Sequence, residues 1–293
     1  MGNKHLMPQA RTVETPTGVQ WDLSPQAFER WAPNLSASVK ADNTISVFDP
    51  IGMDFWTGEG VTAKRIAAAL RSIGADKDVV VNINSPGGDV FEGMAIYNLL
   101  REHQAKVTVK VLGLAASAAS IIAMAGDEVQ IARAGFLMVH NAWVVSIGNR
   151  HDLRDAADFL EPFDQAMADI YMARTGLDAK AVQKKMDAET WINGTAAIDE
   201  GWADELLPAD QVQETKNAAT ARPAAYRYDM VLAKAGMPRS ERRSLLQDLK
   251  ASMLIAAANN GTPSAAEDDD TPRAVIGDLV TALRTFQSEH IGA

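Results

Sequence analysis

A serine inside a run of small residues is the first position in this sequence that could support covalent chemistry. Ser117 lies in the run GLAASAAS at residues 113–120, after a β-branched run and at the start of a helical pattern. Small neighbours let a substrate backbone approach, and a helix N-terminus stabilises developing negative charge. The plain alternative is an N-cap, the commoner role for serine at this position. Ser120, one turn later, is expected to be structural.

A serine nucleophile needs a general base to take its proton. His140 ends an apolar, strand-like run, FLMVH, where its ring can be held rigidly. The other histidines lie in terminal tails, at a polar helix end or in a loop: His5, His103, His151 and His290. A lone histidine at the end of a strand is more often a core residue. Its combination with Ser117 and with the glycine turn at residues 84–89 favours the catalytic interpretation.

A glycine turn at residues 84–89, NSPGGD, lies between a buried strand-like run and a helical pattern. Paired glycines at the start of a helix present bare backbone N–H groups, which are suited to stabilising an oxyanion. The alternative interpretation is an ordinary tight turn. No Gly-Lys-Ser/Thr follows the glycines, so this turn is not a phosphate-binding loop.

The third group of such a site is an acid that holds the imidazole in its productive tautomer. Asp187 and Glu189 are the candidates, in the run MDAETW at the end of a helical pattern. Residue patterns alone do not separate them. The order serine, histidine, acid differs from that of the α/β-hydrolases, and the sequence contains no G-x-S-x-G elbow.

The elements that must position these groups alternate between strand and helix from residue 44 to 206, which predicts an α/β domain with a largely parallel sheet. Strands are predicted at 44–48, 79–83, 106–112, 128–132 and 136–140. Helices are predicted at 62–73, 90–101, 116–124, 152–174 and 179–186.

The sequence changes character after residue 210. Residues 211–222 are predicted to be a linker, and a helix N-capped by Ser240 is predicted to run to about residue 258. Residues 259–273 contain the acidic run EDDD and are predicted to be flexible. A final apolar stripe indicates an amphipathic helix that docks on its own domain or on a partner: Ile276, Leu279, Val280, Leu283 and Phe286.

Composition narrows the classes of function. The chain has 28 Lys and Arg against 38 Asp and Glu, a net charge of −10, which argues against nucleic-acid binding. It contains no cysteine, which removes cysteine nucleophiles, disulfides and thiolate metal sites. The N-terminus lacks a secretory signal, and the longest apolar stretch, 111–125, is too short to span a membrane. We expect a cytoplasmic protein with no nucleic-acid or membrane partner.

Four segments, in this order, resemble the proteolytic subunit of Clp protease (ClpP): INSPGGDVFEGMAIYNLL, GLAASAASIIAMAG, FLMVHNAW and ETWINGTAAIDEGWADEL. The resemblance covers about residues 44–206. It implies a ClpP/crotonase-like α/β fold of stacked ββα units and a serine endopeptidase with a Ser-His-acid triad, needing no cofactor or metal. Carried over residue by residue, it implies Ser117 as nucleophile, His140 as base, and the amides of Gly88 and Ala118 as the oxyanion hole.

Two departures from the family pattern bear on the site. The family's acid lies in a Glu-Arg-Asp segment before an aromatic residue. Aligning that aromatic with Trp191 places the family's Asp at Glu189 and its Glu at Asp187, which narrowly favours Glu189. Asn-Ala follows His140 in place of the usual Gln-Pro. The N-terminal segment does not resemble the loops that engage an unfoldase ring, so no ATPase partner is inferred.

The extra N-terminal stretch and the Ala- and charge-rich C-terminal extension resemble the ClpP-related head maturation proteases of tailed phages and prophages. From this resemblance together with the patterns along the chain, we expect an N-terminal extension (1–43), a peptidase domain (44–210) and a linker with a mainly helical, partly disordered extension (211–293). The resemblance implies cleavage of scaffold or capsid protein in procapsids, and we expect a homo-oligomer in the host cytoplasm. The alternatives are an ATPase-dependent degradation subunit, a crotonase-fold enzyme acting on acyl-CoA, and a non-catalytic capsid assembly protein.

Overall fold

The structure is a computed structural model that describes residues 16, 19–21, 24–32, 35–37, 41–53, 60–208, 212–214, 225, 228–229, 231–233 and 237–259. The chain divides into two compact units, residues 1–220 and 221–293. The predicted boundaries at residues 43/44 and 210/211 stay predictions.

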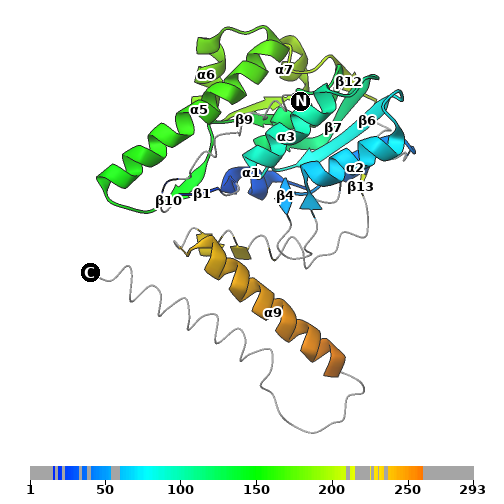
Figure 1. Cartoon of the computed structure of the whole chain (residues 1–293). Coiled ribbons are helices and arrows are strands. Elements are labelled where there is room, and N and C mark those ends of the chain that lie inside the picture. Colours follow the sequence, from blue (N-terminus) through cyan, green and yellow to red (C-terminus); the bar gives the residue numbers. More distant parts are fainter. Residues whose placement is uncertain are drawn as a thin grey trace, which may run out of the picture. The chain divides into compact units, whose positions relative to one another are not determined.

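A seven-stranded sheet forms the centre of the first unit (Figure 1). Its main path runs β11-β9-β7-β6-β3, while β8 pairs with β7 and β12 pairs with β8. The strands are β3 (Thr44–Val47), β6 (Val79–Ser85), β7 (Val107–Ala116), β8 (Glu128–Ala132), β9 (Phe136–Val139), β11 (Thr190–Asn193) and β12 (Glu205–Leu207). All pairs are parallel except β11 with β9. This confirms the predicted α/β fold with a largely parallel sheet.

Helices bury the apolar side chains of this sheet, and Figure 1 shows α2 and α3 lying across it. The helices of this unit that follow β5 are α2 (Ala63–Ile73), α3 (Val90–Arg101), α4 (Ala118–Ala123), α5 (Arg150–Thr175), α6 (Ala179–Asp187) and α7 (Gly194–Asp199). Every residue of α4 is buried. Side-chain caps fix where several helices begin: Asp89 accepts from two amides of α3, and Asp178 accepts from the Ala181 amide of α6. Because Asp89 directly follows Gly88, this cap also fixes the position at which the glycine turn ends.

The junction between β7 and α4 differs from the prediction. The sequence predicts a strand at 106–112 and a helix from 116, whereas β7 continues to Ala116 and α4 begins at Ala118. The reason is Ser117, whose backbone has φ 52° and ψ −126° and belongs to neither element. Small side chains before the serine fit the buried strand as well as a helix, so their pattern did not show the boundary.

Short strands outside the central sheet join distant segments of the first unit. β1 (Val19–Trp21) pairs with β10 (Val144–Ser146), β2 (Leu35–Ala37) with β13 (Val212–Glu214), and β4 (Gly52–Met53) with β5 (Gly60–Val61), all antiparallel. Between β1 and β2 lies α1 (Pro25–Arg30). The prediction of a linker at 211–222 is wrong for residues 212–214, because they pair with β2.

The second unit contains α9 (Arg239–Asn259). The predicted helix is present, but Ser240 lies in its first turn and is not its N-cap. Arg242 is buried, where its Nε donates to Asp229 Oδ1 at 3.0 Å and its Nη1 to the Met237 carbonyl at 3.1 Å. Residues 260–273 and the predicted helix at 276–286 lie outside the described residues. None of the helices described is both long and apolar enough to cross a bilayer.

Candidate active site

Ser117 is held in a strained backbone conformation at the carboxyl end of β7. A positive φ of 52° is uncommon for a residue with a side chain, and residues with such strained backbones cluster at functional sites. Its N–H donates to the Met138 carbonyl at 2.9 Å. Its own carbonyl accepts from the Ser120 N–H at 2.8 Å and from the Ser120 hydroxyl at 2.6 Å. These bonds tie the residue to β9 on one side and to the first turn of α4 on the other.

His140 follows the last residue of β9, and its Nε2 lies 2.7 Å from Ser117 Oγ. Because β7 and β9 are parallel neighbours, their carboxyl ends bring the two side chains together. The imidazole is buried, and this burial lowers the pKa of His140 from 6.5 to about 4. The ring is therefore neutral near pH 7, as a group that accepts a proton from a serine hydroxyl must be.

Of the two candidate acids, the structure brings Glu189 to the histidine. The antiparallel register ends at the pair of Thr190 and Val139, so Glu189, just before β11, and His140, just after β9, lie at the same end of the two strands. Glu189 Oε1 lies 3.9 Å from His140 Nδ1, which is longer than a hydrogen bond. Asp187 Oδ1 instead accepts from Asn141 Nδ2 at 2.8 Å.

The glycine turn lies against the serine. A Cβ on Gly87 would lie 2.7 Å from Ser117 Cβ and 2.6 Å from the Ala116 carbonyl, so only glycine allows this approach. Gly88 forms a parallel bridge with Ile51: the Ile51 N–H donates to the Gly87 carbonyl at 2.7 Å, and the Asp89 N–H to the Ile51 carbonyl at 3.0 Å. In such a bridge the N–H of the central residue, Gly88, points away from Ile51.

Ala118 provides the second predicted oxyanion amide. It is the first residue of α4, and the N–H groups of a first helical turn have no acceptor within their own helix. It directly follows Ser117, so this amide belongs to the same turn as the serine. The structure thus brings Ser117, His140 and Glu189 together. The glycine turn with Gly88 and the amide of Ala118 both lie beside Ser117. Asp187 instead bonds Asn141.

Trp31 and Ala32 of the N-terminal segment bond Asn84 of β6, which in turn bonds β7, and the sequence did not predict this. Trp31 Nε1 donates to the Asn84 carbonyl at 2.9 Å, and Asn84 Nδ2 donates to the Ala32 carbonyl at 2.7 Å. Asn84 directly precedes the SPGG turn, and its Oδ1 accepts from the Leu114 N–H at 3.2 Å. The only signal in the sequence is a tryptophan far from any other predicted element.

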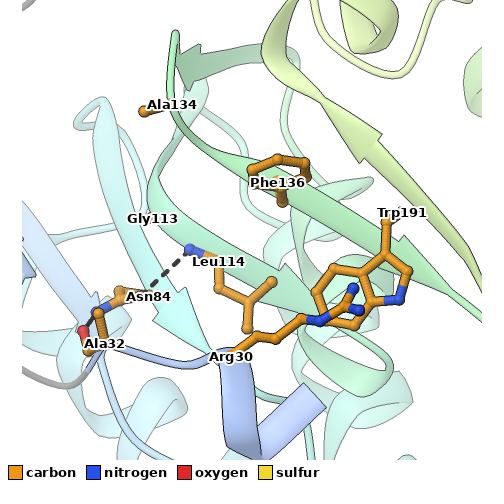
Figure 2. A pocket seen from close by; sticks show the side chains of 8 residues that line it. All are labelled: Arg30, Ala32, Asn84, Gly113, Leu114, Ala134, Phe136 and Trp191. Atoms are coloured by element: carbon orange, nitrogen blue, oxygen red, sulfur yellow. Dashed lines mark hydrogen bonds between the residues drawn. The ribbon is translucent and has the colours of Figure 1, made fainter. Parts of the chain in front are cut away.

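A cavity of about 430 Å³ lies between this segment and the sheet. Figure 2 shows the Arg30 side chain across the Trp191 ring, with its guanidinium carbon 4.3 Å from the ring centroid. The lining residues are Arg30, Ala32, Asn84, Gly113, Leu114, Ala134, Phe136 and Trp191. Arg30, the last residue of α1, thus contacts β11, which begins directly after Glu189. Trp31 and Ala32, which follow α1, bond Asn84 of β6.

Comparison with known proteins identifies the family. Residues 57–210, slightly more than half of the chain, match the family model of Clp protease.

The chain belongs to the Clp protease family.

The Clp protease relatives include "ATP-dependent Clp protease proteolytic subunit 1" of Prochlorococcus marinus, 28% identical over 157 residues, or 52% of this chain and 80% of that protein. The "ATP-dependent Clp protease proteolytic subunit" of Deinococcus radiodurans is 28% identical over 149 residues, 50% of this chain and 72% of that protein. A further relative, proteolytic subunit 1 of Leifsonia xyli, is 29% identical over 171 residues, 55% of this chain and 87% of that protein.

Membership of the Clp protease family makes this chain a serine endopeptidase with the ClpP/crotonase-like fold. Clp proteases act on protein substrates, typically as oligomers. Among the residues that the structure describes, no three His, Asp or Glu side chains gather closely enough to hold a metal ion.

Proposed function

We propose that Ser117 is the nucleophile of this peptidase and His140 its general base. The observation that carries the proposal is the 2.7 Å contact between His140 Nε2 and Ser117 Oγ at a strained serine. Ser117 Oγ attacks the scissile carbonyl carbon while its proton passes to His140 Nε2. The protonated ring then gives that proton to the leaving amine, and a water activated by the same ring releases the acyl group.

The proposed oxyanion hole consists of the amides of Gly88 and Ala118. A donor aimed at the developing oxyanion contributes roughly 2.7–4 kcal/mol to stabilising the transition state. Glu189 orients the ring, because a carboxylate facing Nδ1 favours the tautomer whose Nε2 accepts the serine proton. Its 3.9 Å separation and the 34% exposure of its side chain make this a weaker interaction than a buried hydrogen bond.

The proposed biological role is the cleavage of scaffold or capsid protein during procapsid maturation, by a homo-oligomer in the host cytoplasm. What supports it is the resemblance to head maturation proteases, with sequence on both sides of the match at 57–210. An acidic run precedes an apolar stripe in the C-terminal extension, which would suit docking to scaffold or service as scaffold. No cofactor or metal is needed for this chemistry.

A second candidate role is suggested by the names of the relatives, which are proteolytic subunits of an ATP-dependent protease. In that role the chain would degrade proteins that an ATPase unfolds. The N-terminal segment of this chain weighs against it, because β1 and Trp31 are engaged within the chain, with β10 and Asn84. This role predicts cleavage that depends on ATP.

The experiment that tests the proposed role is intact-mass measurement of the wild-type chain and of Ser117→Ala. Each is purified alone and after co-expression with its candidate capsid and scaffold proteins, without an ATPase. Discrete products that appear with the wild type and are absent with Ser117→Ala are expected. Unchanged masses with capsid and scaffold, together with cleavage once an ATPase and ATP are added, would favour the degradation role.

A further inference from the structure

Three consecutive residues at the end of β9 each meet a different carboxylate. His140 faces Glu189, and Asn141 Nδ2 donates to Asp187 Oδ1 at 2.8 Å. The next residue, Ala142, donates its backbone N–H to Asp164 Oδ1 at 2.6 Å. The short segment between β9 and β10 is thus held by side chains, since β9 ends at Val139 and β10 begins at Val144.

The carboxylates come from two successive helices and the turn that follows them. Asp164 lies on α5, Asp187 is the last residue of α6, and Glu189 precedes β11. α5 is anchored one and two turns beyond Asp164, where Met167, Ala168 and Tyr171 are buried in the core. Asp164 therefore projects from a rigid part of the helix and can fix the position of whatever it binds.

The surroundings of Asp164 disfavour its ionised form. Its pKa is raised by partial burial and by the charges of Asp187 and Glu161, and lowered by the hydrogen bond from the Ala142 amide. Nothing else among these effects favours the ionised form. The hydrogen bond from the Ala142 amide, two residues from the candidate base, is therefore the contact that stabilises the ionised Asp164 at this partly buried position.

We propose that Asp164 is a positioning residue of the peptidase, which fixes the backbone at Ala142 and thereby holds the His140 ring in line with Ser117. This inference rests on the proposed role of Ser117 and His140. An imidazole that shifts by about 1 Å from its reactive position can cost on the order of a hundredfold in rate. Asp164 acts through the backbone and does not touch the reacting atoms.

A fluorophosphonate probe tests this without a natural substrate. Ser117 Oγ attacks phosphorus, the P–F bond breaks and fluoride leaves, and the serine proton passes through His140 to solvent. The maximal rate of labelling reports the alignment of the ring, whereas the half-saturating probe concentration reports probe binding. The two are measured separately for wild type, Ser117→Ala, Asp164→Ala, Asp164→Asn and Asp169→Ala.

Asp164→Ala is expected to lower the maximal labelling rate about tenfold and to change the half-saturating concentration less than about twofold. Asp164→Asn is expected to keep at least about half of the wild-type rate, because its amide oxygen can still accept from Ala142. Asp169→Ala is the matched control: Asp169 is exposed on the same helix and binds Gln165 of that helix, and its loss should leave the rate unchanged.

Thermal unfolding of each variant separates positioning from folding. Equal labelling rates in wild type and Asp164→Ala would overturn the inference. The inference would also be overturned if Asp164→Ala and Asp164→Asn lost labelling rate equally and in proportion to the fall in their melting temperatures. A purely structural role of Asp164 predicts that result. A failure of the proposed function looks different: the wild type would take no label, or Ser117→Ala would take as much as the wild type.

Discussion

Glu189, just before β11, lies beside His140, just after β9, with 3.9 Å between its Oε1 and the ring Nδ1. Its φ of 46° is the second positive value, beside that of Ser117, among the non-glycine residues that the structure describes. Two residues of one constellation therefore carry backbone strain. Such strain persists where the surrounding structure imposes it, and it is concentrated at functional sites.

Replacement of Glu189 by glutamine should lower the rate of fluorophosphonate labelling about tenfold, because a neutral amide no longer favours the productive imidazole tautomer. The loss should be smaller than for a buried acid, since Glu189 is partly exposed. Asp187→Asn is the matched control, because its amide oxygen can still accept from Asn141, and its rate should change less than about twofold. A larger loss in Asp187→Asn than in Glu189→Gln would assign the orienting role to Asp187.

The stability of the fold should depend on the ionisation of His140. Its pKa is about 4 in the folded chain and 6.5 as an ordinary histidine, so the unfolded chain binds the proton more readily between these values. The free energy of unfolding should therefore fall as the pH is lowered from about 6.5 to about 4. The histidine's contribution to this fall is at most roughly 3 kcal/mol.

Urea unfolding from pH 4 to pH 7 checks this, in a Ser117→Ala background that prevents self-cleavage. The same series with His140→Gln should show a shallower dependence over that range, because glutamine does not titrate. Parallel curves for the two proteins would mean that burial does not suppress protonation of this ring.

A side chain at Gly88 should damage the glycine turn. Its Cβ would lie 2.2 Å from the Ile51 carbonyl oxygen and 2.8 Å from the Ile51 nitrogen, so the bridge to Ile51 has to open. Gly176 is the matched control, with φ +72° and no atom within 4 Å of an added Cβ. Gly176→Ala should cost about 1–2 kcal/mol of unfolding free energy from its backbone conformation alone.

Gly88→Ala should cost at least about 2 kcal/mol more than Gly176→Ala, since a forced contact with backbone adds to the strain. Chemical denaturation of both variants measures the difference. Fluorophosphonate labelling should be lost in Gly88→Ala and kept in Gly176→Ala. Equal unfolding free energies would show that the turn can move away from Ile51 at little cost.

The hydrogen bond from Trp31 should stabilise the first unit. Trp31→Phe keeps an aromatic ring but removes the Nε1 donor to the Asn84 carbonyl, and should lower the free energy of unfolding by about 1 kcal/mol. Arg30→Met, which removes the contact with Trp191, should cost less than about 1 kcal/mol. Equal stability of Trp31→Phe and wild type in urea would show that this hydrogen bond adds nothing to the stability of the first unit.

Local patterns predicted much of this fold. The β-branched runs at 79–83 and 128–132 are confirmed as β6 and β8, because their side chains suit a buried strand and turn residues bound them. The helix predicted at 90–101 is confirmed as α3 with the same bounds, since Asp89 caps it. Element type and most boundaries were thus readable from neighbouring residues.

Long-range pairing was not readable in the same way. The sequence left Asp187 and Glu189 unresolved, because the register between β9 and β11 decides which of them faces His140. The hydrogen bond from Trp31 to Asn84 joins residues 53 positions apart, and β13 pairs with β2, which lies near the other end of the first unit's sequence. Nor does the pattern of small residues reveal the positive φ of Ser117, which the surrounding bonds impose.

Mapping the site of fluorophosphonate attachment shows directly whether Ser117 is the nucleophile. Wild-type chain and Ser117→Ala are treated with the probe, digested, and sequenced by tandem mass spectrometry. A single adduct on Ser117 is expected in the wild type and none in Ser117→Ala. An adduct on another residue, or labelling that persists in Ser117→Ala, would contradict the role of Ser117 as the nucleophile.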